Sequence, residues 1–572
     1  MLLLVLAILP TQYLFAEVAA FQEPGVSKEI NALITARQHP FLTQANFANR
    51  TEDLDALYKR GNYQLLWLGN SNSAKNIADA LDLLANAETQ GLIKANYDVD
   101  LLHGKYNLAL AHLPAEYKEL ALYDTALSIA VLRYLHDIHY GRVNPKGINF
   151  NLQLREKKLI DFPAIIKDSL TLNTISQLPL LVEPKLQQYQ KLKSALATYR
   201  LTATKAATFI FLAKGKLRLG ENHPQLTELS RYLASLGDFP ESAIINSTEK
   251  TQKYTPELVE GVKKFQLRHG LGSDGIIGPS TVAAFNEPLS LKITKIELAM
   301  ERLRWLPEMN VNRSIIVNIP AFQLWAIDDL NNDISILNMR VVVGKALKNQ
   351  TPVLMANMSF IEFVPYWNVP KNILKDEILP KLGRNPGFLA SQNMEVVGKN
   401  GKPAALNGEA MENLKKGVFR VRQRPGNKNS LGKVKFIFPN KDDVYLHDTP
   451  SNSLFGRSRR DFSHGCVRVE NPLALAEFAL KNQGKWDVDA IKKAMKRQNT
   501  QRVDLQQPIP VLFFYTTSFV DQNNNLAFYP DIYGHDTVLM EALKKVDDLS
   551  DQSIFVSTSV TPSPIPVPNG MP

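Results

Sequence analysis

The residue best suited to nucleophilic chemistry is Cys466, the one cysteine among 572 residues. It lies in Ser463-His464-Gly465-Cys466-Val467-Arg468, and His447 precedes it by nineteen residues. A thiol attacks as its thiolate, which a neighbouring imidazole or cation favours. Gly465 lets the backbone approach a substrate closely, where N–H groups can stabilise an oxyanion. The segment therefore predicts acyl transfer through a thioester.

The charge around Cys466 favours this interpretation over two alternatives. Besides the two histidines, four arginines lie within about twenty residues of it: Arg457, Arg459, Arg460 and Arg468. A buried structural cysteine would normally have apolar neighbours instead. A zinc site on His464 and Cys466 would need further ligands, for which His447 and Asp448 are candidates. Both alternatives stay open, with nucleophilic catalysis preferred.

The general base is either of two histidines, and chemistry alone does not choose between them. Residues two apart in an extended segment share a face, so His464 can approach Cys466. His447 can act only if its own segment forms a strand beside that of the cysteine.

Residues 1–20 are expected to form a signal peptide. Met1 to Ala16 is apolar and uncharged, and Ala16 and Ala20 are small enough to precede a cleavage point. The segment lacks the Lys or Arg that export signals normally carry. A mis-assigned start, an uncleaved anchor and a buried N-terminal helix are therefore alternatives. An exported chain with a single cysteine forms no internal disulfide, which leaves the thiol free for chemistry.

Composition and charge narrow the class of protein. A chain of 572 residues, 45% hydrophobic and 21% charged, predicts three or four globular domains and excludes wholesale disorder or a membrane bundle. The net charge of +10 favours polyanionic partners. Nucleic acid is one such partner, and the carboxylates of peptidoglycan stems are the candidates for an exported protein. General solubility explains the charge equally well.

The elements that must position these residues fall into several units. Apolar spacings of three and four predict a helical support domain over residues 28–215. Residues 217–290 predict a small unit of three helices, with Gly278-Pro279 opening the third. From about 295 to 498, short β-branched runs such as those at 315–319 and 339–343 predict strands.

Three further segments complete this organisation. Residues 371–432 are rich in Gly, Asn, Lys and Pro and are too long for a simple connection, so the segment is either functional or mobile. Residues 499–550 are expected to form a C-terminal extension that packs on the domains before it. The Ser-, Thr- and Pro-rich tail, residues 551–572, is expected to be disordered. The predicted class is α+β and multidomain.

The motifs resemble the catalytic domain of the YkuD-type L,D-transpeptidases. That family carries a His some fifteen to twenty residues before Ser/Thr-His-Gly-Cys, which matches His447 and residues 463–466. Further similar elements follow in the family's order: Ile316-Val317-Asn318-Ile319-Pro320, Val343-Gly344, Thr351-Pro352 and Pro365-Tyr366-Trp367-Asn368-Val369-Pro370. The resemblance implies a mostly β catalytic domain over 295–498, with residues 371–432 as a capping segment inserted into it.

The resemblance extends to the large Gram-negative members and covers most of residues 50–545. Val262-Lys263-Lys264-Phe265-Gln266 and Asp274-Gly275-Ile276-Ile277-Gly278-Pro279 look like a three-helix peptidoglycan-binding domain over 217–290. A helical scaffold is suggested by Leu57-Tyr58, Tyr63, Trp67, Arg133-Tyr134-Leu135 and Gly141-Arg142-Val143-Asn144-Pro145.

The resemblance also implies roles for single residues. Cys466 would be the nucleophile and His447 its general base, with N–H groups of Gly465, Cys466 or Asp448 forming the oxyanion hole. His464 and Ser463 would support the loop, His464 by a ring hydrogen bond. Two further residues, Tyr445 and Arg468, are candidates for substrate contacts, with structural support as the equal alternative; Trp367 is expected in the core.

The implied reaction is a two-step transfer that joins stem peptides in the periplasm of a Gram-negative cell. The thiolate attacks residue three of a tetrapeptide donor, and the side-chain amine of a diaminopimelate acceptor completes a 3→3 cross-link. The resemblance implies that the protein needs no metal or organic cofactor and binds no nucleic acid. It also implies that carbapenems inhibit the protein and that it is a monomer. Peripheral or signal-anchored membrane association stays open.

Two other functions compete with the transpeptidase. The same Cys466 and His447, with water as acceptor, would give an L,D-carboxypeptidase or a cross-link hydrolase. A non-catalytic cell-wall binding protein would rely on residues 217–290 alone. The intact Ser-His-Gly-Cys motif argues against the binding protein, whereas the sequence does not separate transpeptidase from hydrolase.

Overall fold

The computed structural model describes residues 24–47, 50–68, 72–111, 117–148, 150, 152, 160–205, 209–213, 215–246, 249–307, 313–329, 334–481, 483–521 and 523–551. The predicted signal peptide lies outside these residues, and so does the predicted disordered tail after Asp551. Within the described residues, no helix has both the length and the apolar character needed to cross a bilayer.

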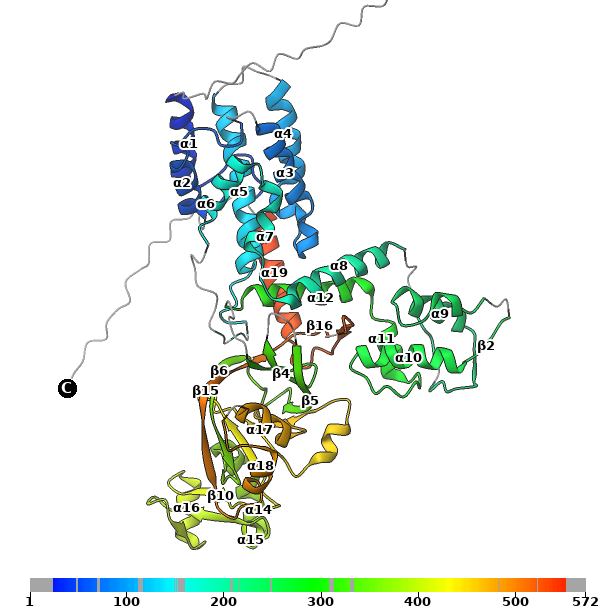
Figure 1. Ribbon diagram of the computed structural model, residues 1–572, viewed down its shortest axis with the longest axis vertical. Coiled ribbons are helices and arrows are strands. Elements are labelled where there is room, and N and C mark those ends of the chain that lie inside the picture. The colour runs from blue at the N-terminus through cyan, green and yellow to red at the C-terminus, as the bar shows by residue number, and fades with distance from the viewer. Residues whose placement is uncertain are drawn as a thin grey trace, which may run out of the picture.

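The chain forms the α+β multidomain architecture predicted from its sequence. Figure 1 shows a bundle of helices at one end, a sheet domain towards the other end and a small group of helices to the side. The bundle, here called the helical unit, comprises α1 (Pro24–Ala36), α2 (Thr51–Lys59), α3 (Ser73–Ala85), α4 (Val99–Ala111), α5 (Tyr117–Tyr140), α6 (Phe162–Leu172) and α7 (Leu178–Val182). Helix α5 is buried on nearly all sides and forms its core.

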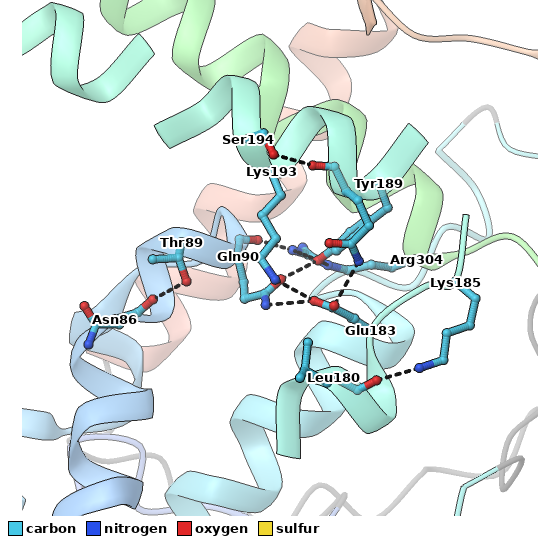
Figure 2. Close-up of polar contacts among 11 residues, drawn as sticks. Asn86, Thr89, Gln90, Leu180, Glu183, Lys185, Tyr189, Lys193, Ser194 and Arg304 are labelled. Carbon is cyan, nitrogen blue, oxygen red and sulfur yellow. Dashed lines mark hydrogen bonds and ion pairs between the residues drawn. The ribbon is translucent and has the colours of Figure 1, made fainter. Parts of the chain in front are cut away.

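Helices α8 (Gln187–Lys205) and α12 (Leu289–Arg304) lie side by side in the middle of Figure 1. They connect the helical unit to the sheet domain and to the small group of helices. Their apolar faces join the core of the sheet domain, so α8, which lies within the range predicted for the helical support domain, links the two units. Buried polar groups cross this junction, as Figure 2 shows. Glu183 accepts from Gln90 at 3.0 Å and Lys193 at 2.8 Å, and Arg304 donates to Tyr189 at 3.1 Å. Buried charges are stable only when partnered in this way.

The small group of helices has the three-helix form that was predicted. It consists of α9 (Leu226–Ser235), α10 (Pro256–Arg268) and α11 (Pro279–Phe285), with a two-stranded ribbon of β1 (Asn222–His223) and β2 (Gln252–Lys253). Leu229, Val262 and Phe265 are fully buried in its own core. Arg268 fixes the unit to its neighbours, because it donates to Asp238 within the unit and to the Tyr199 hydroxyl of α8 at 2.7 Å.

The sheet domain is a ring of strands. Its sheet has the order β13-β5-β14-β12-β11-β6-β15-β3-β4, and β4 also pairs with β5, which closes the sheet on itself. The strands are β3 (Ser314–Asn318), β4 (Gln323–Asp329), β5 (Ile334–Gly344), β6 (Leu354–Phe363), β11 (Val434–Ile437), β12 (Leu446–His447), β13 (Asp461–Ser463), β14 (Val467–Val469) and β15 (Gln501–Phe514). Helices α17 (Pro472–Leu480) and α18 (Val488–Ala494) add buried apolar residues to the same core.

The expected boundary at residue 499 is wrong, because β15 is a central strand of this sheet. It pairs antiparallel with β6 and parallel with β3, with Val511 opposite Ile315. Its alternating apolar residues therefore fill the sheet core instead of packing on it from outside. The remaining C-terminal elements are β16 (Ser518–Val520), β17 (Leu526–Phe528) and α19 (His535–Asp551), and α19 returns to the helical unit, where Asn96 donates to Asp547 at 2.9 Å.

Residues 367–431, here called the cap, form a folded subdomain. It contains α13 (Lys371–Ile373), the π-helical turn η6 (Leu374–Ile378), α14 (Leu379–Arg384), α15 (Phe388–Ser391) and α16 (Gly408–Lys415). Its four-stranded sheet has the order β7-β10-β8-β9, from β7 (Trp367–Asn368), β8 (Met394–Val397), β9 (Pro403–Ala404) and β10 (Arg420–Gln423). Leu382, Leu414 and Val421 are buried in a core of its own. The long segment is thus an ordered insertion between β6 and β11.

Candidate active site

Cys466 and His447 lie on neighbouring strands of the ring. Strand β12 pairs in parallel with β14, so that His447 is opposite Arg468, and Cys466 immediately precedes β14. On the other side β12 pairs antiparallel with β11, which sets Lys435 opposite His447. Residues opposite one another share a face of the sheet. The eighteen residues between His447 and Cys466 therefore lead away from this face and back to it, and the two side chains lie at one place.

A cavity of about 300 Å³ separates this face from the cap. Most of the candidate residues line it: Tyr445, His447, Ser463, His464, Cys466 and Arg468. The cap contributes the opposite wall through residues including Trp367, Phe388 and Leu431. Trp367, which was expected in the core, is half-buried and divides its contacts between the cap core and the cavity. Gly465 and Asp448 are not among the lining residues.

The His447 imidazole is held neutral and in one tautomer. Its Nδ1 lies 2.6 Å from the carbonyl oxygen of Asp448, and because a carbonyl only accepts, Nδ1 donates and Nε2 carries the lone pair. Only 5% of the residue is exposed. Burial, then the charges of Arg468 and Lys435, lower the pKa of His447 to about 3, against the opposing hydrogen bond to Asp448. At neutral pH His447 is therefore an uncharged proton acceptor.

The Cys466 thiol rests in its protonated form. Burial raises its pKa, and this outweighs the Tyr445 backbone N–H, the Tyr445 hydroxyl, Lys435 and Arg468, which all act to lower it. The Sγ atom lies 3.9 Å from the carbonyl oxygen of Asp443. Activation thus requires a base to remove the proton.

The predicted effect of the nearby arginines is correct only for Arg468. Arg459 pairs with Asp461 at 2.6 Å, and Arg460 donates to backbone carbonyls, one of them that of Phe322. Neither acts on the thiol. The second cation at the site is Lys435, whose Nζ lies 4.0 Å from the centre of the Tyr445 ring. Lys435 was not among the residues predicted for the site, and its position before His447 in a β-branched segment gave no chemical signal of its own.

Residues 463–466, here called the catalytic loop, are held by their own polar groups. The Ser463 hydroxyl donates to the Cys466 carbonyl at 2.5 Å and accepts from the Gly465 N–H at 3.2 Å. Gly465 has φ of +115°, a conformation that favours glycine. The Thr351 hydroxyl donates to the Gly465 carbonyl at 2.7 Å. Thr351 belongs to one of the motifs found in the sequence, but its contact with the loop was not predicted.

Two of the three N–H groups expected at an oxyanion hole are already engaged. The Gly465 N–H donates to Ser463, and the Asp448 N–H donates to the Val434 carbonyl at 2.9 Å. The Asp448 carboxylate is used as well, since it accepts from the backbone N–H groups of Lys433 and Thr449. No described residue accepts from the Cys466 N–H. Asp448 therefore anchors strands and is unsuited to the oxyanion role.

The His464 ring extends from the catalytic loop to the cap. Its Nε2 lies 2.5 Å from the Glu377 carboxylate in η6. A second cavity of about 860 Å³ lies on the other side of this contact, lined by residues 345–349, by Asp376 and by Arg459. His464 and Glu377 line both cavities. The ring hydrogen bond expected of His464 is therefore made to a carboxylate of the cap.

The zinc alternative finds no support in the arrangement. No group of three or more His, Cys, Asp or Glu side chains is placed to hold a metal within the described residues. Of the ligands considered, Asp448 and His464 both have other partners.

Comparison with known proteins finds three domain families along the chain. Residues 312–492 match the model of the L,D-transpeptidase catalytic domain of the YkuD family. Residues 52–196 match a scaffold domain, and residues 222–285 match a peptidoglycan-binding domain. The catalytic match falls on the sheet domain, the scaffold match on the helical unit and part of α8, and the peptidoglycan-binding match on the three-helix unit.

Two individual proteins are also similar. The chain is 35% identical over 245 residues to a Haemophilus influenzae protein classed as an L,D-transpeptidase, which is 42% of this chain and 48% of that protein. The match therefore spans about half the length of the relative. A crystal structure of an L,D-transpeptidase from Xylanimonas cellulosilytica matches at 15% identity over 53% of this chain and 100% of that one, with a TM-score of 0.17.

Proposed function

We propose that this chain forms 3→3 cross-links between peptidoglycan stem peptides. By its three matched domains it belongs to the YkuD-type L,D-transpeptidases that carry scaffold and peptidoglycan-binding domains. Cys466 carries the acyl group as a thioester and His447 is the general base. One observation supports this most: a neutral, buried imidazole with a lone pair on Nε2 shares a capped cavity with the single thiol of the chain.

The first step breaks one amide bond and forms one thioester. Nε2 of His447 takes the thiol proton while Sγ attacks the carbonyl carbon of residue three of a tetrapeptide stem. The tetrahedral intermediate collapses and the C–N bond to the terminal D-Ala breaks. The amine of D-Ala leaves with the proton from His447. Because Arg468 and Lys435 disfavour a charged imidazole, His447 returns this proton readily.

The oxyanion of that intermediate has two candidate donors. The N–H of Cys466 has no acceptor among the described residues, and the N–H of Tyr445 faces the cysteine sulfur closely enough to lower its pKa. Both are fixed by the backbone, so they need no reorganisation as charge develops. These two groups replace Gly465 and Asp448 in the proposed oxyanion hole.

Arg468 and Tyr445 are proposed to contact the donor stem. Both side chains line the cavity, and the Arg468 Nε is buried without a hydrogen-bond partner among the described residues. A buried guanidinium N–H without an acceptor is costly and suits a carboxylate from a ligand. Stem peptides carry such carboxylates.

The second step releases the product. The side-chain amine of an acceptor stem attacks the thioester carbonyl, the C–S bond breaks, and the thiol regains a proton. Water competes with this amine, and a covered site excludes it. The cap supplies such a cover, which favours the transpeptidase over the hydrolase that uses the same two residues.

The proposed partners and place follow from this substrate. Peptidoglycan lies outside the cytoplasmic membrane, and the peptidoglycan-binding and catalytic domains indicate an extracytoplasmic location at the cell wall. We place the protein in the periplasm of a Gram-negative cell, as a monomer, and expect carbapenems to acylate Cys466.

Purified protein incubated with disaccharide-tetrapeptides tests this function. Mass spectrometry should detect 3→3 dimers and released D-Ala, and the Cys466→Ala variant should give neither. Formation of monomeric tripeptides alone would identify an L,D-carboxypeptidase. Binding to peptidoglycan with no conversion at all would leave only the cell-wall binding function.

A further inference from the structure

We propose that Tyr533, in the C-terminal segment between β17 and α19, is a positioning residue for the catalytic loop. It lies 67 residues after Cys466 in the sequence and outside the matched catalytic domain, which ends at residue 492. The inference rests on the proposed function, because it assigns Tyr533 a part in acylation of Cys466.

The contact between Tyr533 and the loop runs through one threonine. The Tyr533 hydroxyl donates to the Gly344 carbonyl at 2.6 Å and accepts from the Thr351 N–H at 3.1 Å. The Thr351 hydroxyl accepts from the Gly344 N–H at 2.9 Å and donates to the Gly465 carbonyl at 2.7 Å. Tyr533 therefore closes the turn from 344 to 351 and fixes Thr351 against the loop.

The space around Gly344 shows how tightly this turn is closed. A Cβ atom on Gly344 would lie 1.9 Å from the Asn349 carbonyl oxygen and 2.8 Å from the Thr351 nitrogen. The backbone of residues 344–351 thus folds back on itself, with no room for adjustment beside it. Thr351 is itself fully buried.

The position of the Gly465 carbonyl matters because of peptide geometry. That carbonyl and the Cys466 N–H belong to the same peptide group, which is planar and trans. Holding the carbonyl oxygen therefore fixes the direction of the Cys466 N–H on the opposite side. This N–H is the proposed oxyanion donor, so the hydroxyls of Tyr533 and Thr351 together orient it. Gly465, at φ of +115°, would not hold this orientation by steric restriction alone.

Tyr533 is in turn held by a buried polar cluster. Its N–H donates to the Tyr515 hydroxyl at 2.9 Å, and Tyr515 donates to Asp531. The Asp531 carboxylate also accepts from the Asp536 N–H at 3.0 Å at the start of α19. Asp536, only 4% exposed, pairs with Arg302 of α12 at 2.6 Å. The C-terminal segment is thus fastened to the helix that joins the helical unit, and presents Tyr533 from there.

Acylation kinetics with meropenem test this role in the full chain. The variants Tyr533→Phe and Thr351→Val each remove one hydroxyl, whereas Thr351→Ser keeps it, and Tyr529→Phe is the control from the same segment. We expect Tyr533→Phe and Thr351→Val to lower the maximal acylation rate by about tenfold or more, because a misdirected oxyanion donor stabilises the transition state less. The half-saturating meropenem concentration should stay within about twofold, and Thr351→Ser and Tyr529→Phe should acylate at nearly the wild-type rate.

Two further measurements separate positioning from a general loss of structure. The double variant Tyr533→Phe, Thr351→Val should be no slower than Thr351→Val alone, since both hydroxyls act through the same peptide group. Hydrogen exchange should rise in Tyr533→Phe within residues 463–468 and not in β3 or β6, a readout that needs no activity. The inference would be overturned if meropenem acylates the wild type and Tyr533→Phe shows the same maximal acylation rate and the same hydrogen exchange within residues 463–468. A wild type that meropenem does not acylate would instead count against the proposed function, while hydrogen exchange would still decide the inference.

Discussion

At the scale of single residues, the site is defined by which group holds a proton at rest. Burial raises the pKa of Cys466 and lowers that of His447, so both are neutral near pH 7. A neutral thiol beside a neutral imidazole differs from a preformed thiolate–imidazolium pair. Proton transfer then accompanies attack on the substrate, and the cations Lys435 and Arg468 stabilise the thiolate as it forms.

Substitution of the two histidines separates their roles. His447→Ala should reduce acylation of Cys466 to the background of the uncatalysed thiol, because the other imidazole that lines the cavity, His464, is directed to the Glu377 carboxylate of the cap. His464→Ala should retain part of the rate, since that ring contacts Glu377 in the cap. Intact-protein mass spectrometry after a timed reaction with meropenem measures both. If His464→Ala lost more of the acylation rate than His447→Ala, His464 would be the general base and His447 would not.

The rate of acylation should depend on pH in a way set by His447. Its pKa of about 3 means that the imidazole stays deprotonated, and active as a base, as the pH falls from 8 to 5. The second-order rate of acylation should therefore show no decline with a midpoint near 6.5, the ordinary histidine value. Stopped-flow measurement across this range checks the expectation. A decline centred near pH 6.5 would mean that the imidazole is exposed to water in the functioning enzyme.

How much of the site could be predicted depends on how its residues are connected. Cys466, His464 and Ser463 are consecutive in one motif, and His447 precedes them at a characteristic spacing. The remaining contacts join residues far apart: Glu377 meets His464 across 87 positions, and Tyr533 meets Gly344 across 189. The chain has many glutamates and tyrosines, and only the fold shows which of them lie near the catalytic loop.

At the scale of elements, the sheet and the cap position the site in different ways. Strands β11, β12 and β14 set Lys435, His447 and Arg468 side by side through their register. The helices of the three-helix unit and several strands followed from apolar spacing in the sequence. The place of β15 did not, because strand order is a long-range property, and a buried strand near the C-terminus looks the same wherever it pairs.

Residues of β15 should be essential to the catalytic sheet. Phe513 is fully buried and packs against Phe438 with ring centres 5.5 Å apart. Phe513→Ala should lower the free energy of unfolding of the sheet domain by about 3–5 kcal/mol, through lost burial and the cavity it leaves. Gln506→Ala, at an exposed position of the same strand, should change it little. Denaturant titration followed by tryptophan fluorescence measures the difference, and equal stability of the two variants would contradict a central place for β15.

The cap should control the fate of the thioester. Glu377→Ala removes the 2.5 Å contact between the cap and His464. Water should then reach the acyl-enzyme more easily, so that the ratio of hydrolysed tripeptide to 3→3 dimer rises several-fold. Glu409→Ala, on the exposed surface of the cap, is the matched control and should leave the ratio unchanged. Liquid chromatography of muropeptide products gives this ratio, and an unaltered value in Glu377→Ala would argue against a water-excluding cap.

At the scale of the whole molecule, buried polar junctions join units that the sequence shows only as separate segments. Glu301 of α12 accepts from the N–H groups of Arg142 and Val143, which places the Gly141-Arg142-Val143 motif at the junction of the helical unit with α12. Figure 2 shows the neighbouring cluster around Arg304 and Glu183.

Charge is unevenly distributed over the whole molecule. The cap, residues 367–431, holds twelve Lys or Arg and five Asp or Glu, a net charge of +7 out of +10.

This basic cap should contribute to peptidoglycan binding in a salt-dependent way. Exposed charges act over about a Debye length, so binding to purified peptidoglycan sacculi should weaken as NaCl rises from 50 to 500 mM. Replacing the exposed Lys399, Lys402 and Lys416 by Gln should weaken binding at low salt and flatten the salt response. The same change at Lys28, Lys94 and Lys118, exposed in the helical unit, is the control. A co-sedimentation assay in which both triple variants bind like the wild type would exclude the cap as a contributor.

The central claim, a thioester on Cys466, is tested most directly by trapping the acyl-enzyme. Wild-type protein mixed with a disaccharide-tetrapeptide, quenched in acid within seconds, should gain the mass of the donor less D-Ala. Peptide mapping should place this adduct on Cys466, and neutral hydroxylamine should remove it as a thioester requires. Product formation without any adduct in the wild type, or an unchanged rate in Cys466→Ala, would contradict the account.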